Sequence, residues 1–177
     1  MHRPLALVLV LPILAGAVAG AARAEDVQGA ATARSGAVVT VDGKDIRIYG
    51  IDVPPPGQKC RTRWQREYDC AAKSKEAMEF LVNGKQAVCK TKGIDPEKRP
   101  VGMCRVGGRD IAAVMVAYGW ALAYRTLSPE YIGDESWAQS HRRGLWAGTV
   151  QAPWQWRANQ QPTRRSGPAK PPAGNRS

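Results

Sequence analysis

The chain has 177 residues, with 26 Lys and Arg against 15 Asp and Glu, and its formal net charge is +11. This length suits one domain and excludes a large multidomain enzyme, while 44% hydrophobic residues exclude wholesale disorder. Two of the positive charges lie in residues 1–24 and four in residues 158–177, so residues 25–157 retain a charge of +5.

The first 24 residues have the three parts of a secretory signal peptide. Arg3 supplies the positive start, Leu5 to Leu14 form the apolar stretch, and Ala22-Arg23-Ala24 is a small-x-small cleavage site. A membrane anchor is the alternative, but Pro12 interrupts the apolar run and no cluster of charges follows it. We therefore expect residues 1–24 to be removed and the mature protein, without a membrane span, to be exported to the periplasm or secreted.

The remaining chain predicts alternating strands and helices. Residues 25–35 are small and polar and predict a flexible N-terminal arm, and the Asp-Gly pair at 42–43 between two β-rich runs predicts a hairpin. The predicted strands are residues 37–41, 45–51, 86–90 and 101–106, and the predicted helices are residues 71–82, 111–118 and 128–143. Residues 158–177, rich in Pro, Gly and Arg, predict a disordered tail. This order is α+β, and a small β-barrel is the natural closure for short antiparallel strands.

Four cysteines are an even number, which predicts disulfides in an exported chain. Three pairings are possible, and we favour Cys60–Cys70 and Cys89–Cys104 because each pair is close in sequence and the second falls on two predicted strands. A zinc site is the alternative, but no Cys-x-x-Cys spacing occurs and the mature chain has a single histidine, His141.

That single histidine excludes mechanisms that need a pair of histidines. His141 precedes Arg142-Arg143 at the end of a predicted helix, where a cation interacts favourably with the helix dipole, so we interpret it as structural. Carboxylate and arginine chemistry remains, and this chemistry suits metal-assisted attack on a phosphodiester.

Several blocks of the sequence occur in the order and spacing of a known protein family. They are Ile46 to Pro54, Gln58 with Cys60, Cys70 with the helix after it, Val88-Cys89, Asp95 to Arg99, Cys104, Tyr118 to Tyr124, Arg143 to Trp146, and Pro153 to Arg157. The first block, IRIYGIDVP, resembles the IRLxGIDxPE block of the thermonuclease family, the staphylococcal-nuclease-like proteins. The resemblance covers residues 36–157 as one domain, and it implies a five-stranded OB-fold-type β-barrel with three helices.

The resemblance also implies an activity and a set of site residues. Members of this family cleave DNA and RNA with one Ca²⁺ held by two aspartates, a glutamate that activates water, and two arginines that hold the phosphate. Asp52 matches one of the metal-binding aspartates. Arg47 and Arg99 match the two arginines and are therefore the candidate catalytic residues.

Two members of the family's acidic set are absent from this sequence. The family's Asp-Gly-Asp-Thr corresponds to residues 35–38, so Ala37 stands in place of the other metal-binding aspartate, and Pro55 stands in place of the glutamate. Because Ca²⁺ binding depends on the number of carboxylates, we expect a weak or absent Ca²⁺ site at Asp52. Losing a general base lowers a rate by about 10²–10⁴-fold. The nearby acids that could act instead are Asp42, Asp45, Asp95 and Glu97.

Two functions remain in competition. The first is a Ca²⁺-dependent phosphodiester hydrolase of DNA or RNA whose activity is weak or lost. The second is a non-catalytic OB-fold module for nucleic acid or an acidic exopolysaccharide, because a pocket that keeps its arginines and loses its acids attracts polyanions. Trp64, Tyr68 and Tyr124 are the candidate substrate-binding residues, although a solvated basic loop also explains the first two. A structural role in a cell-envelope complex is a third possibility, and we expect a monomer.

Overall fold

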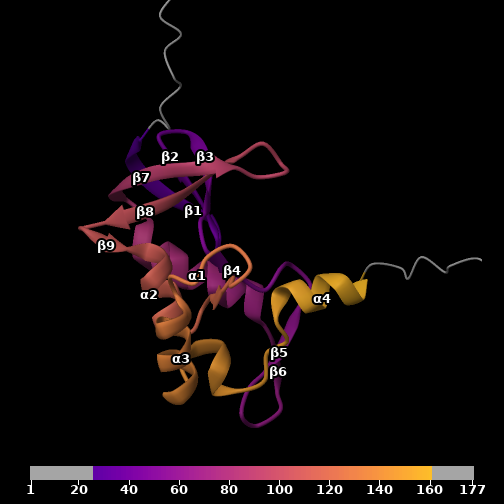
Figure 1. The fold of residues 1–177 in the computed structure, drawn as a ribbon. Coiled ribbons are helices and arrows are strands. Elements are labelled where there is room, and N and C mark those ends of the chain that lie inside the picture. The colour runs from indigo at the N-terminus through magenta and orange to yellow at the C-terminus, as the bar shows by residue number, and fades with distance from the viewer. Residues whose placement is uncertain (1–25, 161–177) are drawn as a thin grey trace, which may run out of the picture.

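A closed β-barrel of five strands forms one end of the molecule in the computed structural model, which describes residues 26–160 (Figure 1). The barrel strands are β1 (Val27–Ser35), β2 (Val38–Val41), β3 (Lys44–Ile48), β7 (Lys85–Ile94) and β8 (Pro100–Val106). Neighbouring strands are antiparallel in the order β3-β2-β1-β7-β8, and a parallel pairing of β3 with β8 closes the barrel. The expected α+β fold with an OB-fold-type barrel is confirmed. The expected signal peptide lies outside the described residues.

Helices and short strands cover one end of the barrel and extend away from it (Figure 1). The helices are α1 (Cys70–Val82), α2 (Ile111–Ala117), α3 (Ile132–Ser140) and α4 (Pro153–Gln160), with a 3₁₀ turn η1 (Gly144–Ala147). The short strands are β4 (Ile51–Asp52), β5 (Lys59–Arg61), β6 (Glu67–Asp69), β9 (Arg109–Asp110) and β10 (Leu122–Ala123). None of the helices in residues 26–160 is long and apolar enough to cross a membrane.

Residues 26–160 contain four α-helices where the sequence predicts three. The additional helix is α4, which begins at Pro153, a residue suited to the first helical position because its missing N–H has no helical partner to lose. Residues 158–160 belong to this helix, so the expected disordered tail does not begin at residue 158. Residues 161–177 lie outside the described part of the chain.

The expectation of a flexible arm over residues 25–35 is wrong, because Val27–Ser35 forms the barrel strand β1. This strand pairs with β2 on one side and with β7 on the other. Val27 and Ala31 are buried in the core, while Gln28 and Ala30 are exposed. The small residues of β1 carry no strong strand propensity of their own, so pairing with two neighbouring strands determines its conformation.

The β2–β3 hairpin and the first two helices agree with the sequence. Asp42 and Gly43 turn the hairpin with positive φ angles of 49° and 73°, as an Asp-Gly turn requires. Asp69 caps α1 by accepting a hydrogen bond from the Ala72 N–H at 3.0 Å, and Asp110 caps α2 in the same way.

The third predicted helix is shorter than residues 128–143. The Ser128 hydroxyl accepts a hydrogen bond from the Glu130 N–H at 3.1 Å, and this contact caps a turn that precedes α3. His141 follows the last helical residue and stacks on Trp137 with ring centroids 4.3 Å apart. This packing agrees with the structural interpretation of His141.

Both predicted disulfides, Cys60–Cys70 and Cys89–Cys104, are present, and all four sulfurs are therefore unavailable to zinc. Cys89 and Cys104 lie directly opposite each other on β7 and β8 and belong to the main core inside the barrel. Cys60 and Cys70 belong to a second, smaller core with Leu122 and Leu145. Each disulfide stabilises the fold by about 2–4 kcal/mol, mainly by restricting the unfolded chain.

Two adjacent alanines test the position of β1. Ala31→Asp places an unpaired charge in the core, and we expect it to lower the free energy of unfolding by about 3 kcal/mol or more. Ala30→Asp, on the exposed side of the same strand, should change it by less than about 1 kcal/mol. Urea denaturation followed by tryptophan fluorescence measures both values. Equal effects of the two variants would mean that residues 27–35 do not pair as a barrel strand.

Candidate functional site

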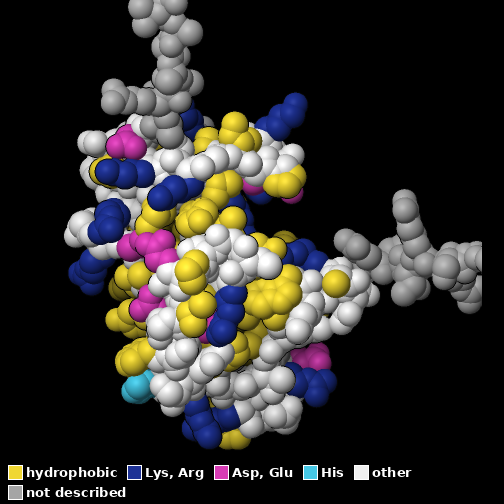
Figure 2. Space-filling view, in the orientation of Figure 1, with side chains coloured by type: hydrophobic (Ala, Val, Ile, Leu, Met, Phe, Trp, Pro, Cys, Tyr) yellow, Lys and Arg dark blue, Asp and Glu magenta, His cyan; other side chains and the backbone are white. Residues whose placement is uncertain are grey.

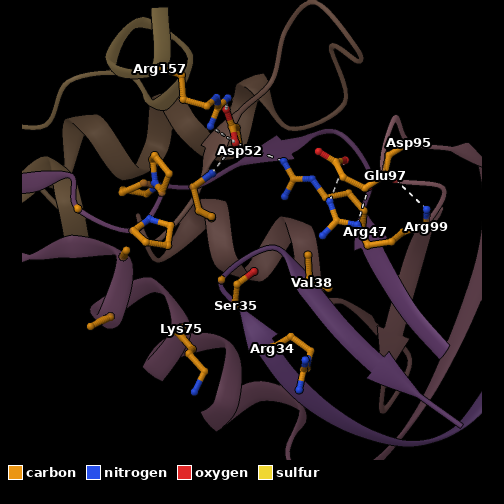
Figure 3. A pocket seen from close by; sticks show the side chains of 18 of the residues that line it. Arg34, Ser35, Val38, Arg47, Asp52, Lys75, Asp95, Glu97, Arg99 and Arg157 are labelled. Carbon is orange, nitrogen blue, oxygen red and sulfur yellow. Dashed lines mark hydrogen bonds and ion pairs between the residues drawn. The ribbon is translucent and has the colours of Figure 1, made fainter. Parts of the chain in front are cut away.

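A cavity of about 580 Å³ lies between the barrel, the Pro54–Gly57 loop, α1 and α4 (Figure 3). Figure 2 shows the surface as hollowed between the β7–β8 turn and α4, with Lys and Arg side chains beside the hollow. The charged side chains that line the cavity are the cations Arg34, Arg47, Lys75, Arg99 and Arg157 and the acids Asp52, Asp69, Asp95 and Glu97. The three candidate site residues of the sequence, Arg47, Asp52 and Arg99, therefore share one cavity.

Asp52 is the most enclosed charged group of this site, with 3% of its surface exposed. Strand β4 holds its backbone by pairing with β10, where Leu122 lies opposite Asp52. Its Oδ1 accepts hydrogen bonds from the Val53 N–H at 3.0 Å and from Arg47 Nη2 at 3.2 Å. Arg157 of α4 donates to both oxygens, with Nη1 at 3.4 Å from Oδ1 and Nη2 bonded to Oδ2 (Figure 3). A buried carboxylate requires such partners, because removing an unpaired charge from water is unfavourable.

Arg47 extends from β3 across the floor of the cavity. Its Nη1 donates to the Ala37 carbonyl at 3.3 Å, and its Nη2 donates to the Ile51 carbonyl at 3.2 Å as well as to Asp52. Burial lowers the pKa of Arg47, Asp52 raises it, and the charges of Arg99 and Arg157 lower it further. Arg99 and Arg157 are therefore each close enough to repel Arg47, although arginine remains a cation at neutral pH.

Arg99 is held by the turn that joins β7 to β8. Its Nε donates to Asp95 Oδ2 at 2.8 Å, its Nη2 donates to Glu97 Oε2 at 3.1 Å, and its own N–H donates to Asp95 Oδ1 at 2.8 Å. Although burial by itself raises the pKa of Asp95, the hydrogen bonds and charge of Arg99 hold that pKa below its ordinary value. Asp95 and Glu97 thus act as partners of Arg99, and neither lies free to take over a missing acidic role.

Arg157 is a site residue that sequence reasoning does not assign. It belongs to one of the blocks that resemble the thermonuclease family, but nothing in its local pattern connects it with Asp52, 105 residues earlier. Lys75 is a second unassigned residue, on the face of α1 that presents Ala71 and Ala72 to the cavity. Small residues one turn before a lysine on the same helix face are the only local signal that could have indicated it.

The three candidate aromatic residues do not line one cavity. Tyr124 lines a neighbouring cavity of about 340 Å³ that shares Arg47 with the main one. Tyr68 packs on the second core, where burial raises its pKa, so we reassign it from substrate binding to packing. Trp64 is 67% exposed and does not line the main cavity.

Residues 45–148 match the family model described as "Staphylococcal nuclease homologue". The chain belongs to the staphylococcal nuclease family. It is also similar to two proteins of Oryza sativa subsp. japonica, "Probable staphylococcal-like nuclease CAN3" (31% identical over 122 residues) and "Probable staphylococcal-like nuclease CAN1" (32% identical over 115 residues). These matches cover 67% and 63% of this chain but only 30% and 32% of the relatives, so the chain spans about a third of their length.

The staphylococcal nuclease family is generally Ca²⁺-dependent, but the residues of this site do not fit a Ca²⁺ ion. Both oxygens of Asp52 are engaged by arginines. Ala37 is fully buried and offers only its carbonyl, which already accepts from Arg47, and Pro55 lines the cavity without a side-chain oxygen. Residues 26–160 contain no group of three or more His, Cys, Asp or Glu side chains that could hold a metal ion, whereas Ca²⁺ takes six to eight oxygen ligands.

The Asp95–Arg99 pair predicts a defined dependence of stability on pH. Because the pKa of Asp95 is lowered in the folded state, its ionised form stabilises the fold above about pH 4, and this contribution is lost as the pH falls further. Asp95→Asn should therefore lower the free energy of unfolding by about 1 kcal/mol at pH 7, and this difference from the wild type should shrink as the pH falls below about 4. Asp26→Asn, at an exposed position, is the control. A difference between wild type and Asp95→Asn that stays constant from pH 7 to pH 3 would contradict this assignment.

A second prediction concerns Ca²⁺ itself. A site with a Kd of about 1 mM would gain about 1.4 kcal/mol at about 10 mM Ca²⁺, which raises Tm by roughly 4 °C. For this protein we expect a change below about 1 °C, relative to Mg²⁺ at the same concentration. Thermal unfolding followed by circular dichroism measures it, and a Ca²⁺-specific rise of several degrees would show that a Ca²⁺ site exists.

Proposed function

We propose that this member of the staphylococcal nuclease family binds the phosphodiester backbone of DNA or RNA in the Arg47–Asp52–Arg99 cavity, and that Ca²⁺-dependent hydrolysis is weak or lost. The observation that carries the proposal is the pairing of Asp52 with two arginines. The one metal-binding aspartate that remains is bonded by Arg47 and Arg157, so the cavity presents guanidinium groups in the region where the family holds a metal ion.

The donors of the cavity suit a phosphate. Arg99 commits Nε and Nη2 to Asp95 and Glu97, which leaves its Nη1 to donate to a phosphate oxygen. Arg157 commits Nη1 and Nη2 to Asp52, and its Nε remains. Hydrogen bonds between guanidinium groups and phosphate are short and strong because both partners are charged. Tyr124, in the adjoining cavity beside Arg47, is positioned to contact a base or sugar of the bound strand.

Two groups that the family uses for hydrolysis, a metal-binding aspartate and a general base, are missing from this cavity. Ala37 and Pro55 provide neither a metal ligand nor a base, and the acids nearest the arginines are already paired with them. Losing a general base costs about 10²–10⁴ in rate, and the loss of the metal adds to that cost without being simply additive. Binding needs neither component, which is why we place binding ahead of cleavage.

Family membership favours nucleic acid as the polymer, since the relatives are named as nucleases. An acidic polysaccharide is the second candidate because the positive charge of the domain attracts any polyanion. We also propose that the protein is an exported monomer with residues 1–24 as its signal peptide. Two disulfides are consistent with an oxidising compartment.

Binding of a fluorescent 12-residue oligothymidylate, followed by anisotropy over a series of salt concentrations, tests the proposal. We expect equal affinity in EDTA and in Ca²⁺, and a plot of log affinity against log salt that falls by about 0.7 for each phosphate contact. Arg99→Gln should weaken binding and reduce that slope by about one contact. Arg105→Gln, an exposed arginine outside the lining of the cavity, is the matched control.

Four outcomes would contradict the proposal. The first is affinity that requires Ca²⁺. The second is Ca²⁺-dependent cleavage of the oligonucleotide that Arg99→Gln abolishes. Either result would show that the protein acts as a Ca²⁺-dependent member of the family. Equal losses in Arg99→Gln and Arg105→Gln would mean that net charge, and not the cavity, binds the strand. Binding to alginate with no measurable binding to the oligonucleotide would identify an acidic polysaccharide as the polymer.

A further inference from the structure

A tryptophan at the tip of the β5–β6 hairpin is exposed to solvent and does not line the cavity. Trp64 is 67% exposed. Trp137, the other tryptophan among the exposed large hydrophobic residues of the described part of the chain, is 44% exposed. The guanidinium carbon of Arg63 lies 3.9 Å from the centre of its ring, and Arg66 is exposed on the same tip. Figure 2 shows hydrophobic and Lys or Arg side chains together at the end of the molecule that carries this hairpin.

The exposure of Trp64 does not come from a loose loop. The hairpin strands pair in register, with Arg61 opposite Glu67, and the Cys60–Cys70 disulfide fastens their base. At the tip, the Thr62 N–H donates to the Arg66 carbonyl at 2.9 Å. The backbone of Arg61 exchanges two hydrogen bonds with Thr149, at 3.0 and 2.9 Å, which ties the hairpin to the segment before α4. A rigid support therefore holds an aromatic ring in solvent.

The hairpin begins and ends at the wall of the cavity. Residues 54–57, which precede β5, line the cavity. Asp69, Ala71 and Ala72, at the other end of the hairpin, line it as well. Trp64 is five residues from Asp69 along the shorter arm of the hairpin, which at about 3.3 Å per residue is roughly 16 Å. A bound strand that leaves the cavity would reach the tip after a few nucleotides.

We propose that Trp64, with Arg63 and Arg66, is a second contact site for single-stranded nucleic acid, in which an unpaired base stacks on the indole ring and the arginines attract the neighbouring phosphates. This inference rests on the proposed function of the cavity. A nucleic acid is the partner that fits because it carries phosphates for the arginines and a π face for Trp64 on one chain. Base–aromatic stacking on this kind of surface is tolerant of sequence.

The test compares oligothymidylates of two lengths and a duplex. Trp64→Ala should lower the affinity for a 12-residue oligothymidylate by about tenfold, the effect of losing one stacked base. It should leave unchanged the affinities for a three-residue oligothymidylate, which is too short to reach the tip, and for a 12-base-pair duplex, whose bases are already stacked. Trp64→Phe should retain most of the affinity because a ring remains.

Trp137→Ala is the matched control, since Trp137 is also exposed but lies on α3. The pocket variant Arg99→Gln separates the two proposals, because it should weaken both single strands, whereas Trp64→Ala should weaken only the longer one. Tryptophan fluorescence is a further readout. We expect the 12-residue strand to quench it in the wild type and not in Trp64→Phe.

Specific results would overturn the inference. If the wild type binds the 12-residue strand and Trp64→Ala binds it equally well, the hairpin site is wrong while the cavity proposal stands. If Trp64→Ala weakens binding to alginate, which has no bases, by the same factor, then Trp64 does not act by base stacking. If the wild type binds neither oligothymidylate, both proposals fail.

Discussion

One buried carboxylate organises the functional side of this molecule. Asp52 is almost fully enclosed, and a carboxylate at that depth requires positive partners. Arg47 supplies one from the barrel and Arg157 supplies another from the last described helix, 105 residues further along the chain. Because both arginines bond to this one acid, Asp52 joins the barrel strand β3 to α4 at the edge of the cavity. The same contacts occupy the oxygens that a metal ion would need.

Part of the positive charge of residues 25–157 can be traced to the cavity, because two acids of the family pattern are missing there. Acids at positions 37 and 55 would lower the formal charge of residues 25–157 from +5 to +3, and both positions carry uncharged residues at or beside the cavity. Removing anions from a site that keeps its arginines raises its attraction for phosphate without any new contact. The lining of the cavity keeps five cations and four acids, so it carries a small positive excess, and it would be negative with acids at both positions. The proposed binding of a nucleic acid backbone depends on this local excess, and the proposed hairpin site adds two further arginines beyond the cavity.

Local chemistry accounts for the elements that the sequence predicts well. The Asp-Gly turn produces its hairpin, Asp69 and Asp110 cap their helices, and the cysteine pairs close in sequence form the disulfides. The elements that differ depend on distant partners. Strand β1 contains small residues without a strong preference, and it is a strand because β2 and β7 pair with both of its edges. The turn at Ser128 satisfies its own backbone locally, and so the helix after it starts later.

The sequence by itself determined the family resemblance, the barrel class, the disulfide pairing, and the residues Arg47, Asp52 and Arg99 together with the missing acids at Ala37 and Pro55. These features are encoded in short blocks whose chemistry can be recognised without knowing what lies opposite them. Only the tertiary structure decided that Arg157 bonds to Asp52, that Asp95 and Glu97 pair with Arg99, and that Tyr68 packs, partly buried, against the second core while Trp64 faces solvent. Ion pairs and burial are properties of two surfaces brought together by the fold, and no pattern along one segment of the chain specifies its partner across the molecule.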